Sequence, residues 1–273
     1  MNFEDYKGAY EAIPLCQTEQ SQTFLVQRDG IKVVCKRFPS SIERAREEIT
    51  YRYLVEEDVI NIPRLFMFGE DFLEFEFIEK VRDPEDIEII NEISRLYLKT
   101  LDNAPSFLLS RPDLTRERIF YRLSYLKEEF TKSGNSEEGI LEKAKRFVQR
   151  NYDLSQHLCV VHGDLKSPHC IPSSQGLFFI DFGITVIANP WYDLAYLYLE
   201  KKDKTGLLER FTRMAYETLG DTLNVNEEQI WQYLRSGIFY RSLYYLGFAL
   251  RHRPKKSIER AKMELTKIIK ETK

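Results

Sequence analysis

Cysteine is scarce in this chain of 273 residues, and its four cysteines lie far apart in the sequence. They are Cys16, Cys35, Cys159 and Cys170, and no two of them form a CxxC pair. Structural zinc sites and redox motifs of the common kinds use such pairs. Neither kind of site is therefore indicated, and we expect buried free thiols in a chain long enough to fold on its own hydrophobic core.

Long apolar runs and an excess of charge of one sign are missing as well. No stretch approaches the roughly 18 consecutive apolar residues that indicate a membrane-spanning helix. The 40 basic and 43 acidic residues give a formal net charge of -3, so no general attraction to nucleic acid follows. The first residues, MNFED, are acidic where a secretory signal would be basic. These absences predict a cytoplasmic protein with no integral membrane segment and no nucleic-acid partner.

Glycine is absent from residues 14–24, PLCQTEQSQTF, which lie between two segments of strand-like composition. The chain contains neither GxGxxG nor GxxxxGK[ST]. The common glycine-rich loops that hold phosphate are therefore excluded. A nucleotide, if one binds, must meet hydroxyl groups and backbone amides of a different loop.

Residues 1–80 have the pattern of a small sheet with one helix. The segments SQTFLVQ and IKVVCKRF flank Asp29-Gly30, which is a strong hairpin signal. A helix is predicted to begin at Ser41, with a serine as its N-cap candidate. The segment RLFMFGEDFLEFEFIEK predicts two further strands that break at residues 69–71. We expect a five-stranded antiparallel sheet.

After Asp83-Pro84 the pattern becomes mainly helical, with one β interruption at residues 158–182. The predicted helices cover 84–101, 114–132, 137–151, 204–219, 226–250 and 256–271. The fold class is therefore α+β, with a small N-terminal lobe at 1–80 and a larger, mainly helical lobe at 81–273. A cleft between two lobes is a natural place for a ligand.

Two aspartates, Asp164 and Asp181, each follow an apolar strand-like run. The first lies in LCVVHGDLKSPHC and the second in GLFFIDFGI, with a turn predicted at 173–176 between them. A hairpin is expected to bring both carboxylates to one rim. A pair of carboxylates suits a divalent metal site, an acid/base pair or glycoside hydrolysis, so the pair alone leaves the chemistry open.

The residues around the two aspartates indicate which of these chemistries applies. They read His162-Gly163-Asp164, Ile180-Asp181-Phe182-Gly183 and Asp193-Leu194-Ala195. This arrangement resembles the aminoglycoside phosphotransferase and choline kinase branch of the protein-kinase-like superfamily. The resemblance implies a two-lobed kinase-like fold and ATP-dependent transfer of phosphate to a hydroxyl of a small molecule, with Mg²⁺ as cofactor. A sugar or an aminoglycoside-like compound is the expected acceptor.

The resemblance also implies roles for single residues. Asp164 is the expected catalytic base, Asp181 the expected Mg²⁺ ligand, and Lys166 is expected to steady the transferred phosphoryl group. Seven further residues are expected at the nucleotide. Lys36 is the expected cation and Glu47 its partner on the helix. The expected phosphate loop contains Ser21, Gln22 and Thr23, and the expected adenine-facing hinge contains Ile78 and Lys80. Strand alternation supports part of this, because it places Val34 and Lys36 on one face and Val33, Cys35 and Arg37 on the other.

His169 departs from the family pattern, which has asparagine five residues past the aspartate. Imidazole nitrogen is a poor ligand for Mg²⁺ and a better one for Mn²⁺, so Mn²⁺ is an alternative cofactor. His169 is either a metal ligand or a structural hydrogen-bonding residue, and a pseudokinase that scaffolds a partner is a third reading. A histidine here also resembles the kinases of the Kdo and heptose sugars of the lipopolysaccharide core.

Other features bear on the acceptor. Lys166 keeps a protein serine/threonine kinase as an alternative, but the chain from Gly183 to NPWYDLA is too short for a peptide-binding activation segment. Arg235 and Arg241 interrupt an apolar helical pattern and are candidates to hold an anionic or polyhydroxyl acceptor. The basic stretch 251–262 is a solvated helix end or a contact for acidic substrate or for a membrane surface.

Overall fold

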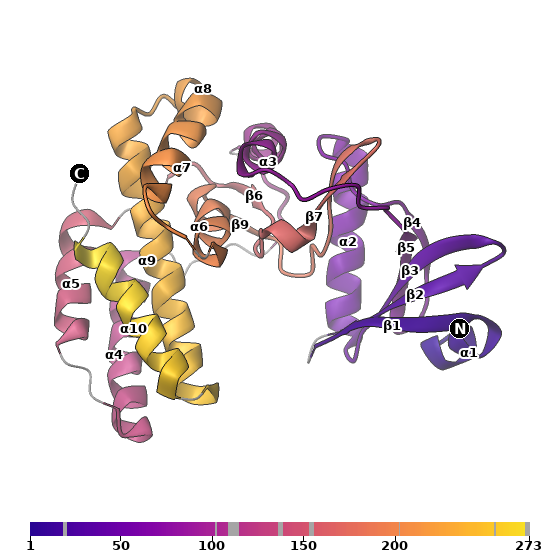
Figure 1. The fold of residues 1–273 in the computed structure, drawn as a ribbon, viewed down its shortest axis with the longest axis horizontal. Coiled ribbons are helices and arrows are strands. Elements are labelled where there is room, and N and C mark those ends of the chain that lie inside the picture. Colours follow the sequence, from indigo (N-terminus) through magenta and orange to yellow (C-terminus); the bar gives the residue numbers. More distant parts are fainter. Residues whose placement is uncertain are drawn as a thin grey trace. The chain divides into compact units, whose positions relative to one another are not determined.

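The computed structural model of the protein describes residues 1–18, 21–101, 103–108, 115–135, 139–152, 156–201, 203–253 and 255–270. These residues pack into two compact units (Figure 1). The sheet unit comprises Met1–Leu96 and Lys166–Thr185, and the helical unit comprises Tyr97–Leu165 and Val186–Lys273. The segment that carries Asp181 thus packs with the N-terminal strands. The lobes expected from the sequence, 1–80 and 81–273, stay a prediction.

The sheet unit contains the predicted five-stranded antiparallel sheet, in the order β1-β2-β3-β5-β4. Its strands are β1 (Glu11–Gln17), β2 (Gln22–Arg28), β3 (Ile31–Arg37), β4 (Leu65–Phe68) and β5 (Phe72–Glu76). The predicted hairpin is confirmed: Arg28 pairs with Ile31 across the two-residue turn. Asp29 and Gly30 have φ values of 50° and 83°, as expected of an Asp-Gly hairpin turn.

Two helices pack against the sheet. The predicted helix after β3 is α2 (Ser41–Glu57), which ends at Asp58 in the left-handed conformation. The helix α1 (Phe3–Ala9), which buries Phe3 and Tyr6, was not predicted. Its start was visible in the sequence, because the side chain of Asn2 caps the helix at the amide of Asp5 (2.9 Å).

The face of the sheet under α1 forms the hydrophobic core of this unit, with Val33, Cys35 and Phe72 fully buried beneath Phe3 and Tyr6. The other face of β3, with Val34 and Lys36, is left for the site described below. One face of the sheet therefore stabilises the unit, and the other is available for chemistry.

The segment predicted as β-structure, 158–182, divides between the two units. In the helical unit, β6 (Cys159–Val161) pairs with β9 (Val186–Ala188). In the sheet unit, β7 (Cys170–Ser173) pairs with β8 (Gly176–Phe179), and the predicted turn at 173–176 is confirmed. A short 3-10 turn, η2 (Ser167–His169), precedes β7.

The helical unit is built around α9 (Glu227–His252), whose start carries a capping box between Asn226 and Gln229. The helices α6 (Trp191–Glu200) and α10 (Lys255–Lys270) pack against it, and Figure 1 shows α10 lying along α9. The remaining helices are α3 (Asp86–Thr100), which spans both units, α4 (Arg116–Ser133), α5 (Ile140–Asn151), α7 (Leu207–Ala215) and α8 (Asp221–Leu223).

Some predicted helix boundaries differ from the structure. The helix expected from residue 84 begins at Asp86, because the carboxylate of Asp83 binds Lys80 (2.5 Å) instead of capping the helix. The helix expected at 204–219 is α7 followed by a π-helical turn at Tyr216–Gly220. Positions 114, 137, 138 and 271 of the predicted helices lie outside the described residues.

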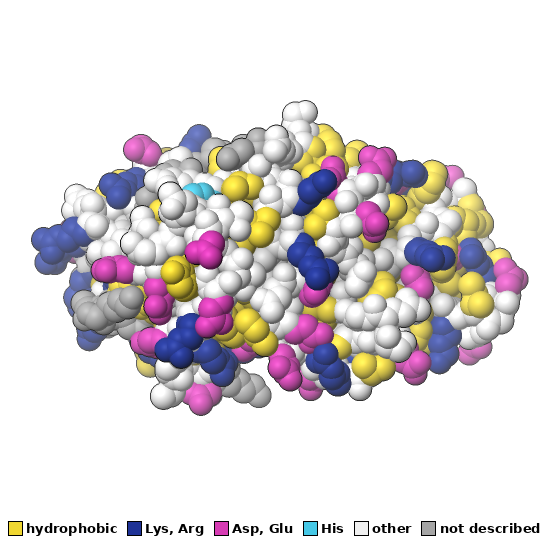
Figure 2. Space-filling view, turned by 90° about the horizontal axis from the view of Figure 1, so that it is seen from above, with side chains coloured by type: hydrophobic (Ala, Val, Ile, Leu, Met, Phe, Trp, Pro, Cys, Tyr) yellow, Lys and Arg dark blue, Asp and Glu magenta, His cyan; other side chains and the backbone are white. Residues whose placement is uncertain are grey.

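The surface charge and the state of the cysteines can be compared with what the sequence predicts. Basic and acidic side chains are interspersed on the face that Figure 2 shows, with no large field of one sign. None of the helices that the structure describes is long and apolar enough to cross a membrane. All four cysteines are free thiols, but Cys16 is exposed, because it lies on the edge strand β1, whereas the other three are buried as predicted.

Candidate active site

Lys36 is the centre of a charged cluster in the sheet unit. Its Nζ lies 2.9 and 2.7 Å from the two carboxylate oxygens of Glu47 and 2.6 Å from Oδ1 of Asp181. The three residues come from β3, α2 and the segment after β8. The structure therefore brings together three side chains that the sequence analysis selected from separate parts of the chain.

Burial makes this cluster electrostatically strong. Glu47 is 1% exposed, and the side chain of Lys36 is largely buried. Burial alone would lower the pKa of Lys36, but the adjacent carboxylates of Glu47 and Asp181 raise it above its ordinary value. Lys36 therefore carries a fixed positive charge, which suits a role in holding the phosphates of a nucleotide.

The segment Asp181-Phe182-Gly183 is anchored to α2. Phe182 is fully buried and meets Tyr51 edge-on, with ring centroids 5.5 Å apart. A Cβ at position 183 would lie 2.9 Å from Oε2 of Glu47, so only glycine allows this approach. Asp181 itself has φ 67°, a conformation in which aspartate is tolerated better than most residues.

Among the described residues of the sheet unit, Asp181 and His169 are placed to hold a divalent cation. Oδ2 of Asp181 lies 3.4 Å from Nε2 of His169, and the side chain of Asp181 is 41% exposed. A carboxylate oxygen and an imidazole nitrogen are a donor set that Mn²⁺ accepts readily, and Mg²⁺ uses mainly the oxygen. The residues present therefore fit a cation at this point.

The residues predicted for the phosphate loop divide between the two faces of the sheet. Thr23 pairs with Lys36 in the register of β2 and β3, so the two share a face, whereas Gln22 pairs with Arg37 on the opposite face. Ser21 precedes β2, and its amide donates to Oγ1 of Thr18 (3.0 Å). The intervening residues 19 and 20 lie outside the described part of the chain.

The residues predicted for the hinge follow β5. Ile78 is half-buried, whereas Lys80 is exposed and forms the ion pair with Asp83. The amide of Val81 donates to the carbonyl of Pro172 (2.9 Å), which fixes the segment to β7. The backbone of this segment therefore has a defined position within the sheet unit.

In the helical unit, Asp193 holds the loop that leads to Asp164. Its carboxylate accepts the backbone amides of His162 (2.6 Å) and Gly163 (2.8 Å) and the hydroxyl of Tyr97 (3.1 Å). Asp193 is fully buried, and burial raises its pKa, although the two amides and nearby positive charge oppose the shift. The loop is thus fixed by a buried carboxylate.

We expect Asp193→Asn to disturb this loop strongly. An asparagine offers one oxygen, so one of the two buried amides loses its acceptor, at a cost of about 2 kcal/mol. The free energy of unfolding in urea should fall by about that amount, and turnover should fall with it. The exposed Glu209→Gln on α7 is the matched control, which should leave both unchanged. Wild-type stability in Asp193→Asn would contradict the bracing role.

The end of the loop meets α6 and α9. Arg241 donates to the carbonyl of Gly163 (2.6 Å), and its guanidinium lies 3.6 and 4.2 Å from the ring centroids of Tyr192 and Tyr196. The hydroxyl of Tyr196 is hydrogen-bonded to Asp164, and burial together with that carboxylate raises the pKa of Tyr196. Asp164 is half-buried. Two side chains from different helices therefore fix its surroundings.

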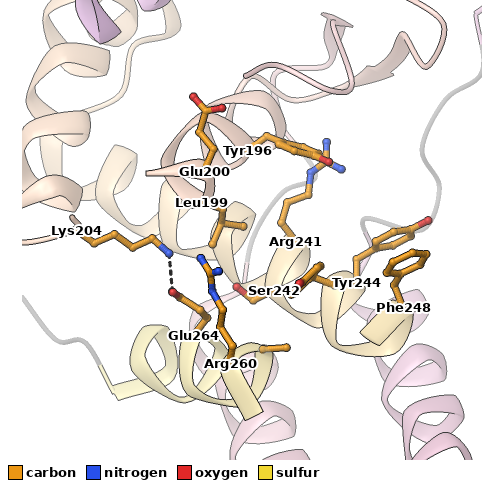
Figure 3. Close-up of a pocket in the computed structure, with 12 residues that line it drawn as sticks. Tyr196, Leu199, Glu200, Lys204, Arg241, Ser242, Tyr244, Phe248, Arg260 and Glu264 are labelled. Carbon is orange, nitrogen blue, oxygen red and sulfur yellow. Dashed lines mark ion pairs between the residues drawn. The ribbon is translucent and has the colours of Figure 1, made fainter. Parts of the chain in front are cut away.

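These two side chains also line a pocket of about 510 Å³ within the helical unit (Figure 3). It lies between α6, α9 and α10 and has the following lining residues: Tyr196, Leu199, Glu200, Lys204, Arg241, Ser242, Tyr244, Tyr245, Phe248, Arg260, Ala261 and Glu264. Its volume is within the range of small-molecule sites. A built cavity thus adjoins Asp164 through Tyr196 and Gly163 through Arg241.

The other candidates of the sequence analysis lie elsewhere. Arg235 is a structural residue, because it donates to the carbonyl of Ile268 (3.0 Å) and stacks on Trp231 (4.6 Å). Lys166 is half-buried at the start of η2 in the sheet unit. Tyr196 was missed, although its spacing of three residues from Asp193 places both on one face of α6.

The sequence matches one known protein family. The model of the APH family, a phosphotransferase enzyme family, matches residues 16–223. No curated protein sequence matches the chain.

Solved structures match over nearly the whole chain. The gentamicin complex of APH(2")-IIa gives a TM-score of 0.68 at 16% identity, covering 97% of this chain and 96% of that chain. The GDP complex of wild-type aminoglycoside 2'-phosphotransferase-IIIa gives 0.67 at 19%, covering 95% and 92%. Choline kinase from Cryptosporidium parvum Iowa II gives 0.65 at 14%, covering 96% and 89%. At such identities these structures show the fold, so the predicted α+β kinase-like fold is confirmed.

Proposed function

The chain belongs to the APH family of phosphotransferase enzymes, and we propose that it transfers the γ-phosphate of ATP or GTP to a hydroxyl of a sugar or aminoglycoside-like molecule. The observation that carries this proposal is the cluster of Lys36, the buried Glu47 and the partly exposed Asp181. A lysine held by a buried glutamate, beside an aspartate that remains partly exposed, is the arrangement that positions nucleotide phosphates in kinase-like enzymes.

The proposed reaction is a single displacement. The acceptor oxygen forms a bond to the γ-phosphorus, the bond from that phosphorus to the bridging oxygen breaks, and the nucleoside diphosphate leaves. Asp164 orients the hydroxyl and takes its proton, while Lys36 holds the phosphates of the donor. Lys166 neutralises charge on the transferred group. Positioning and electrostatics account for catalysis.

Three neighbouring regions complete the proposed nucleotide site. Ser21 and Thr23 supply hydroxyls for the phosphates, and Gln22 supports the loop from the other face of the sheet. Backbone groups from Ile78 to Lys80 meet the adenine or guanine edge. The GDP complex of a structural relative supports GTP as a donor beside ATP.

A divalent cation is part of the proposed site, with Asp181 and His169 as its protein ligands. When bound, such a cation neutralises the charge that develops on the β- and γ-phosphates. Asp181 offers its Oδ2 toward His169, while its Oδ1 binds Lys36. Asp181 would therefore hold the cation through one carboxylate oxygen while the other binds Lys36.

Several alternative acceptors remain to be distinguished by experiment. Gentamicin and choline appear in the names of structural relatives, and a lipopolysaccharide-core sugar remains an alternative because of His169. A small molecule is favoured over a peptide because α6 begins at Trp191, only eight positions after Gly183. A pseudokinase scaffold would bind nucleotide without transferring phosphate.

The test uses ATP and GTP labelled at the γ-phosphate, with sugars, aminoglycosides, choline and a generic basic protein as acceptors. Labelled small-molecule product supports the proposal. Labelled protein alone would favour a protein kinase, and nucleotide binding without transfer to any acceptor would favour the scaffold. Either result would overturn the proposed reaction.

Metal dependence gives a separate prediction for His169. A chelator should abolish transfer, and Mn²⁺ should restore it at least as well as Mg²⁺, because one proposed ligand is an imidazole. His169→Asn replaces nitrogen by oxygen and should raise the ratio of Mg²⁺- to Mn²⁺-supported turnover by about tenfold. An unchanged ratio would assign His169 a structural role. The exposed His252→Asn is the control.

A further inference from the structure

The pocket beside Asp164 has an uneven balance of charge. Three cationic side chains line it, Lys204, Arg241 and Arg260, against two carboxylates, Glu200 and Glu264. Both carboxylates already have basic partners: Glu264 binds Lys204 (2.7 Å), and Glu200 lies 3.4 Å from Nζ of Lys201. The pocket therefore has no acidic group that lacks a cation.

The two arginines of the pocket, Arg241 and Arg260, have different contacts. Arg241 is buried, binds the carbonyl of Gly163 and stacks on Tyr196, so it belongs to the frame of the loop. Arg260 is an exposed residue of α10 and forms no ion pair with any residue that the structure describes. Figure 3 shows its guanidinium directed into the pocket beside Glu264. It is therefore available to a ligand.

Aromatic side chains form much of the remaining wall. Tyr244, Tyr245 and Phe248 come from α9, and Tyr196 comes from α6. Arg122 stacks on the ring of Tyr244 (4.5 Å). Such walls suit the faces of sugar rings or other flat molecules, with polar groups fixing the orientation.

From this arrangement we infer that the acceptor carries an acidic group, a carboxylate or a phosphate ester, which binds Arg260 while its hydroxyl lies at Asp164. This inference deepens the proposed function and rests on it. A guanidinium binds both acidic groups through paired hydrogen bonds. A polyamine such as an aminoglycoside would instead meet the cationic Arg260, with both carboxylates already paired with lysines.

Matched probes test the inference by binding alone. They are p-nitrophenyl β-D-glucoside, its glucuronide, its 6-phosphate and the corresponding 2-amino glucoside, and titration calorimetry measures each dissociation constant. Because the Arg260 site is open to solvent, we expect the glucuronide, the 6-phosphate or both to bind roughly fivefold more tightly than the glucoside. The amino glucoside should bind more weakly than the glucoside. Equal or weaker binding of both acidic probes would overturn the inference.

Variants of α10 identify the residue responsible. Arg260→Gln should abolish the preference for the acidic probes, and Arg260→Glu should reverse it toward the amino glucoside. The control is Lys256→Gln, an exposed cation of the same helix that does not line the pocket. A preference that persists in Arg260→Gln, or that is lost in Lys256→Gln, would also overturn the inference.

Phosphate transfer to the same probes is measured separately with labelled ATP and GTP. Charge-selective binding without transfer would contradict the proposed reaction while supporting the assigned pocket chemistry. Transfer to the glucoside or amino glucoside without any acidic preference would support the reaction and contradict the inference. The two failures are therefore distinguishable.

Discussion

Asp164→Asn should lower kcat for phosphate transfer by roughly a thousandfold, as expected for the loss of a positioned general base. The variant keeps the shape of the side chain, and its amide can still meet the hydroxyl of Tyr196, which binds the wild-type carboxylate. It cannot take the proton of the acceptor hydroxyl at neutral pH. Rates with labelled nucleotide, measured in a single turnover, report this step directly.

Nucleotide affinity should survive the same substitution, because the proposed nucleotide-holding residues are Lys36 and Glu47, and Asp164 is proposed to act on the acceptor hydroxyl. A fluorescent ATP analogue should bind both proteins within about a factor of two, well below the tenfold that 1.4 kcal/mol would give. Asp221→Asn removes an exposed carboxylate of the helical unit and is the control. Wild-type turnover in Asp164→Asn would remove Asp164 from the mechanism.

In the sheet unit, the features that depend on neighbouring residues in the sequence were predicted correctly. The hairpin at Asp29-Gly30 follows from the φ values that only such residues adopt easily. The alternation of β3 separated Lys36 from Cys35, and the structure buries Cys35 on the opposite face. α1 was missed because seven residues give little periodicity, and its stability comes from packing of Phe3 and Tyr6 on the sheet.

The choice among the acids of α2 shows what pattern alone cannot settle. Glu47 and Glu48 are adjacent, and composition does not distinguish them. In the structure Glu47 binds Lys36, whereas Glu48 binds Arg44 (2.6 Å) and Arg52 (2.9 Å) of its own helix. The assignment of Glu47 relied on the family resemblance, and the helical geometry supplies its physical reason.

The pocket of the helical unit could not be predicted from the sequence. Tyr196, Arg241 and Arg260 are separated by tens of residues and meet only because α6 and α10 pack against α9. The sequence marked Arg241 as an arginine within an apolar pattern and Arg260 only as part of a basic stretch. Which arginine faces a cavity depends on the rotation of each helix, and that is decided by tertiary packing.

Lys36→Met should lower kcat/KM for the nucleotide by roughly a hundredfold, because it removes the cation that is proposed to hold the phosphates. Glu47→Gln should cost less, since Asp181 still contacts the lysine at 2.6 Å. The double variant should be little worse than Lys36→Met, because residues that act as a unit are not additive. Additive losses in this cycle would show that Glu47 does not act through Lys36.

Lys36→Met should also destabilise the protein in a pH-dependent way. It leaves the buried Glu47 without its cation, at a cost of about 3 kcal/mol near neutral pH. Burial and the charge of Asp181 both raise the pKa of Glu47, and only Lys36 opposes them in the native protein. In the variant, Glu47 takes up a proton in the folded state as the pH falls, so the loss should shrink in acid. Urea unfolding at several pH values measures this, and the double variant Lys36→Met/Glu47→Gln should lack the dependence. A loss that is constant with pH would mean that Glu47 is not left charged and buried.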